Sequence, residues 1–189
     1  MILSVRFYGG TPEMADIRQR VEEDMGLLKK IQSFVPGFRG YRKREDLRDA
    51  DRMLRMQLVD RLGRQRKRLE DSRTLITKSF DSKPLDLLGG LISQFKKVEG
   101  EVLHAEMGYS GFVADLEVKE NELNRLYEFD AGMFADVMSI AASIDALQPA
   151  LSSQDDGKSI MTLNEMRTKI AEFEDFFNRG MLVITGSEV

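Results

Sequence analysis

A seven-residue repeat of apolar positions keeps one register from Leu88 to Leu147. Its two core positions, usually called a and d, are occupied by Leu88, Leu91, Phe95, Val98, Val102, Ala105, Tyr109, Phe112, Leu116, Lys119, Leu123, Leu126, Asp130, Met133, Val137, Ile140, Ile144 and Leu147. Sixteen of these eighteen residues are apolar or aromatic. Strands alternate with a period of two and cannot generate this spacing, whereas packed helices do. The stretch therefore predicts helices that pack against other helices.

Three further segments carry helical periodicity. Apolar residues spaced by three, four or seven run from Met14 to Val35 and stop at Pro36. In the segment of about 43–78, leucines recur every eleven residues, which indicates a nearly straight helix. A last apolar face begins at Leu163 and ends near Gly180. The sequence thus predicts an all-α protein, an elongated bundle of about five long antiparallel helices with coiled-coil-like packing.

Several breaks divide this pattern. Gly108 and Gly111 interrupt the seven-residue repeat, so we expect a turn or kink that folds its two halves into an antiparallel pair. The alternative is one continuous helix of about 90 Å. Residues 148–161 have the composition of a mobile loop, and Thr162 with Glu165 forms a capping box for the last helix. We expect one domain, 1–189, with an N-terminal arm (1–10) and a tail (181–189).

Composition excludes several classes of protein. The chain has no cysteine, so it has no disulfide, no thiolate metal ligand and no cysteine nucleophile, and a reducing cytoplasm is the expected location. No run of about 18 uncharged apolar residues predicts a membrane-spanning helix. Residues 1–8 carry a charge too early for the apolar core of an export signal.

The basic residues are concentrated in one helix. Residues 42–78 hold 13 of the 28 Lys and Arg but only 7 of the 32 Asp and Glu. Arg61, Arg64 and Arg68 form a row along this helix and are candidates for contact with a partner or with the phosphates of nucleic acid or anionic lipid. Interleaved acids such as Asp60 favour the other interpretation, in which the charges pair within the protein.

Candidate metal and catalytic groups are sparse. Glu101 and His104, the only histidine, have the Glu-x-x-His spacing of dimetal carboxylate bundles, but the repeat places His104 away from the core. The sequence contains no phosphate-binding glycine loop, no nucleophile elbow and no His-Glu-x-x-His motif. We therefore expect no catalytic residue, no cofactor and no metal, and a ferritin-like metal-binding bundle is a lesser alternative.

Asp130 is the polar residue that stands out most. It occupies a core position between Leu123 and Val137 in an otherwise apolar row. A buried carboxylate must be paired, hydrogen-bonded or protonated, because an isolated charge is costly at low dielectric. We interpret Asp130 as a buried polar residue that sets the helix register, and as a candidate switch.

Three segments resemble a group of small, uncharacterised all-helical prokaryotic proteins: Pro-Gly-Phe-Arg-Gly-Tyr-Arg-Lys-Arg-Glu (36–45), Gly-Tyr-Ser-Gly-Phe (108–112) and Leu-Tyr-Glu-Phe-Asp (126–130). That group has no assigned activity, so the resemblance implies no catalytic residues. It implies a turn near residues 108–111, and it makes Asp130 part of a motif.

These observations favour a non-enzymatic protein that interacts with other proteins or acts as a scaffold, with self-association as one form of the interaction. The alternative is a peripheral module that binds an anionic membrane or nucleic acid through the basic helix.

Overall fold

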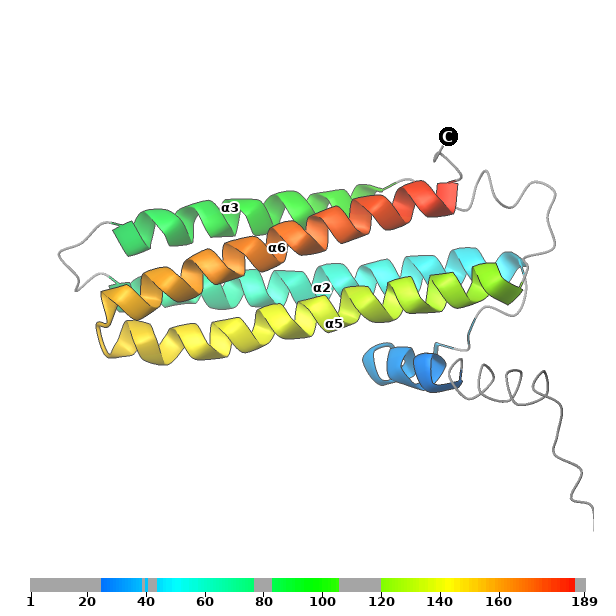
Figure 1. The fold of residues 1–189 in the computed structure, drawn as a ribbon, viewed down its shortest axis with the longest axis horizontal. Helices are drawn as coiled ribbons and strands as arrows, with labels where there is room; N and C mark the ends of the chain where they lie inside the picture. Colours follow the sequence, from blue (N-terminus) through cyan, green and yellow to red (C-terminus); the bar gives the residue numbers. More distant parts are fainter. Residues whose placement is uncertain (1–24, 39, 41–43, 77–82, 106–119, 186–189) are drawn as a thin grey trace, which may run out of the picture.

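The computed structural model describes residues 25–38, 40, 44–76, 83–105 and 120–185, and this part of the chain is all-helical. Four long helices form the bundle: α2 (Arg44–Ile76), α3 (Lys83–His104), α5 (Glu120–Ser152) and α6 (Asp156–Thr185). Residues 25–34 form a shorter helix outside them (Figure 1). The predicted elongated all-α bundle is confirmed. Residues 1–10 lie outside the described part.

The four long helices are arranged as a square. α2 packs on α3 and α5, and α6 packs on the same two helices. α2 and α5 run in one direction, while α3 and α6 run in the other (Figure 1). The chain therefore forms two antiparallel hairpins, α2 with α3 and α5 with α6, which lie side by side.

The apolar repeats face the centre of this square. On α3, the core positions Leu88, Leu91, Phe95, Val98 and Val102 are all buried, and on α5 so are Leu126, Met133, Val137, Ile140, Ile144 and Leu147. The stripe on α2 is buried at Leu54, Leu58, Leu62, Leu69 and Ile76, and that on α6 at Leu163, Met166, Ile170, Phe173 and Phe177. Periodicity therefore identified the core face of each long helix.

The two halves of the seven-residue repeat form separate helices, so the continuous helix of about 90 Å is wrong. α3 and α5 run antiparallel, as expected (Figure 1). They are not neighbours, however, because each of them packs on α2 and α6. A repeat of apolar residues reports which face is buried and not which helix covers it. The predicted turn at residues 108–111 lies outside the described residues.

The loop predicted at residues 148–161 is wrong, because most of this tract is helical. α5 continues through Pro149 to Ser152, and α6 begins at Asp156. Proline has no N–H donor and its ring crowds the carbonyl four residues earlier, but the carbonyl of Pro149 still accepts a hydrogen bond from the N–H of Ser153 at 3.0 Å. Burial of Ala150 and Leu151 holds this last turn of α5 in the core.

The capping box predicted at Thr162 is also wrong. α6 is capped earlier, at Asp155, whose Oδ1 accepts a hydrogen bond from the Lys158 N–H at 2.9 Å. The chain reverses at Gln154, which has a left-handed φ of 58°. Thr162 is buried inside α6 and donates to the carbonyl of Lys158. At its other end α6 continues beyond Gly180 to Thr185, so the tail predicted to begin at 181 starts as helix.

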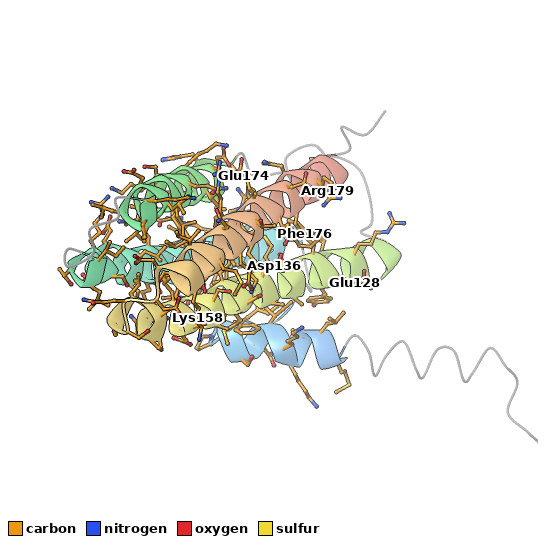
Figure 2. All side chains as sticks on the ribbon, turned by 60° about the vertical axis from the view of Figure 1, so that its left-hand side comes forward. Glu128, Asp136, Lys158, Glu174, Phe176 and Arg179 are labelled. Atoms are coloured by element: carbon orange, nitrogen blue, oxygen red, sulfur yellow. The ribbon has the colours of Figure 1, made fainter. Side chains whose placement is uncertain are left out.

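The α5–α6 hairpin is interlocked by two glycines and two aromatic rings. The Phe176 ring lies where a side chain on Gly132 would be, 2.8 Å from an ideal Cβ, and the Phe129 ring occupies the same place beside Gly180. The two rings contact each other, with centroids 5.2 Å apart. Figure 2 shows Phe176 at the seam between α6 and α5. Each helix thus accepts an aromatic ring of the other at a position without a side chain.

This interlock predicts a reversal of the usual effect of alanine in a helix. Gly180→Ala and Gly132→Ala should each lower the free energy of unfolding by about 1–3 kcal/mol, because the new methyl group displaces a packed ring. Gly100→Ala on α3 is the matched control, since nothing lies within 4 Å of its added Cβ, and it should raise stability by about 0.5–1 kcal/mol. Urea unfolding measures both. Equal effects at Gly180 and Gly100 would contradict the interlock.

Candidate interaction surface

The arginine row of α2 does not form one exposed surface. Arg68 forms an ion pair with Asp145 of α5 and donates to Gln65, and Arg61 is half-buried. Arg64 is the exposed member, with 64 % of its side chain accessible, and it pairs with Asp60 one turn earlier. Arg61 and Arg68 therefore contact other elements of the same chain, whereas Arg64 pairs within α2.

The neighbouring Arg55 is also used internally. It is 8 % exposed, forms an ion pair with Asp51 at 3.0 Å and donates to the carbonyl of Ala105, just beyond the last residue of α3, at 2.5 Å. A cation is favourable there because the carbonyls at a helix C-terminus carry partial negative charge. Burial raises the pKa of the Asp51 carboxyl, and the adjacent Arg55 opposes that rise.

Ion pairs also join α3 to its two neighbours. Arg66 of α2 bonds Glu99 of α3 at 2.8 Å, and Lys97 of α3 bonds Glu174 of α6 at 2.5 Å. Between α5 and α6, Lys169 of α6 donates a hydrogen bond to the Ser143 hydroxyl of α5 at 2.7 Å. With the Arg68 pair described above, every seam of the square has a polar contact between helices.

Arg61 marks the place where residues 25–38 meet the bundle. Its guanidinium lies over the rings of Phe34 and Phe134, 5.3 and 5.8 Å from their centroids, and donates to the Phe34 carbonyl at 3.0 Å. The two rings are stacked, with centroids 5.0 Å apart. We call this contact of α2 and α5 with residues 25–38 the aromatic seam. A cation over an aromatic face is worth roughly 0.5–2 kcal/mol.

The rest of the segment continues this packing. Ile31, Val35 and Phe38 are almost fully buried, and the Phe38 ring meets Tyr127 of α5 edge to face. The turn after the helix is closed by Gln32, which donates to the Phe38 carbonyl. Gly37 and Gly40 both have positive φ, 89° and 83°, which glycine adopts without strain.

Tyr127 and Phe134 were not predicted as the partners of residues 25–38, although a signal for them exists. Tyr127 and Phe134 are seven residues apart and each directly follows a d position of the repeat. They widen the apolar stripe of α5 on one side. A stripe wider than two neighbours require indicates a third packing partner.

The metal hypothesis gains no geometric support. His104 is exposed, and Glu101 pairs with Lys97 at 3.5 Å. Within the described residues, no group of three or more His, Asp or Glu could hold a metal ion. No helix in this part of the chain has the length and apolar character needed to cross a membrane.

Asp130 is buried, as the sequence analysis predicts for its core position, with 4 % of its surface exposed. There it takes part in an interaction with another group. Its role as a polar switch stays a prediction.

Large apolar side chains are exposed on α2 and α3 at about the same level of the hairpin. Met53 and Met56 on α2 are 40 % and 57 % exposed, and Leu103 on α3 is 52 % exposed. The hydrogen bond from Arg55 to the Ala105 carbonyl fixes the antiparallel register of the two helices, and it places Leu103 at about the level of Met56. We call these three side chains the methionine patch.

Two carboxylates face each other across the α5–α6 seam. Asp136 is half-buried on α5, and Glu172 is exposed on α6. Burial raises the pKa of Asp136, and the charge of Glu172 raises it further. Figure 2 shows Asp136 at this seam. Ionised Asp136 therefore opposes folding at neutral pH.

Asp136→Asn should raise the free energy of unfolding at pH 7. The folded protein binds its proton more tightly than the unfolded chain, so the wild type loses stability as pH rises from the ordinary Asp value near 3.9 through the raised pKa. Below the ordinary Asp pKa, the gain in stability of Asp136→Asn should vanish. Urea unfolding from pH 3.5 to 8 measures it, with Glu172→Gln expected to give a smaller gain. A gain independent of pH would contradict the assignment.

No family model matches this chain, and the searches of curated proteins and of solved structures found no similar protein.

Proposed function

We propose that this protein is a non-enzymatic interaction or scaffold protein of the cytoplasm that binds another protein through an outer face of its bundle. The observation that carries the proposal is the methionine patch. Three large apolar side chains are exposed at one level of the α2–α3 hairpin, and clusters of exposed apolar side chains are typical of binding surfaces.

The residue types support this assignment. Five of the seven methionines whose burial is described are exposed, namely Met25, Met53, Met56, Met138 and Met161, while Met133 and Met166 are buried. Methionine is unbranched and polarisable, so it adapts to the shape of a partner and is common at surfaces that bind helices. Met53 and Met56 of the methionine patch can therefore adapt to the surface of a protein partner.

The surroundings of the methionine patch have the polar rim expected of an interface. Asp49, Arg52 and Asp60 are exposed on the same helix as the two methionines, and His104 is exposed beside Leu103. Charged residues around an apolar centre keep the free protein soluble. In a complex they lie at the margin of the interface, where they stay in contact with water. The patch thus combines an apolar centre with charges of both signs around it.

A photo-crosslinking amino acid placed at Met56 tests this proposal in the cells that express the protein. We expect a discrete crosslinked product from position 56, and its loss when Met53→Glu and Leu103→Glu are added. Position 161 is the matched control, because Met161 is equally apolar and 64 % exposed but lies on α6. The same products from both positions, or none from position 56, would contradict the proposal.

A second candidate function is contact with a polyanion, either anionic lipid or nucleic acid, through α2. The observation that favours it is the exposure of Arg52, Arg64, Lys67 and Arg73 on that helix. Exposed cations that neutralise phosphates release counterions, so such binding weakens steeply with salt.

Anionic vesicles and duplex DNA, used as separate probes at low and high salt, test this candidate. Binding should fall with salt and should fall at least about tenfold at low salt in Arg64→Ala with Lys67→Ala. Arg68→Ala is the informative comparison, because its side chain is engaged by Asp145 and should matter less to a polyanion. Binding that ignores salt, or no binding to either probe, would remove this candidate.

A further inference from the structure

We draw no further inference here: the strongest candidate, the cluster of exposed apolar side chains Met53, Met56 and Leu103 on the α2–α3 hairpin, is the surface already proposed for protein binding, and nothing in the structure shows which partner covers it.

Discussion

Every long helix of this bundle must bury a single apolar stripe against two neighbours at once, and the remaining features follow from that requirement. A stripe that serves two neighbours must be wider than the seam of a two-stranded coil. α5 carries the widest stripe, because Tyr127 and Phe134 extend it towards residues 25–38 while its a and d positions face α2 and α6. The smaller helix therefore lies beside α5, where this third apolar face would otherwise meet water.

Charge has a structural role at the same seams. Cross-helix contacts such as Arg66 with Glu99 and Lys97 with Glu174 lie at the edges of the apolar stripes, where partly exposed ion pairs contribute modestly to stability but define which helices are neighbours. The basic character of α2 is explained largely in this way. Arg55 donates to a carbonyl at the C-terminal end of α3, and Arg61 donates to one at the C-terminal end of the helix of residues 25–34. The basic helix α2 thus holds the ends of two neighbouring helices.

The sequence predicted the core more completely than it predicted the arrangement. Apolar spacing identified the buried faces of all four long helices, because burial acts on each residue separately. It did not identify the diagonal placement of α3 and α5, since any apolar stripe can cover any other. Pro149 was misleading because the loss of one N–H donor did not end α5, whose last turn is held by the burial of Ala150 and Leu151. The widened stripe of α5 indicates a further packing partner, but which residues meet there, Phe34 with Arg61 and Phe134, depends on contacts between distant segments.

The short reversal at Gln154 also bears on how the chain folds. It separates Ser152 from Asp156, so α5 and α6 become neighbours through contacts that begin only a few residues apart in the chain. Closing so short a loop costs little entropy, and local contacts of this type are associated with rapid folding. We therefore expect the α5–α6 hairpin to form as a unit, with the docking of the α2–α3 hairpin as the slower and more cooperative step of assembly.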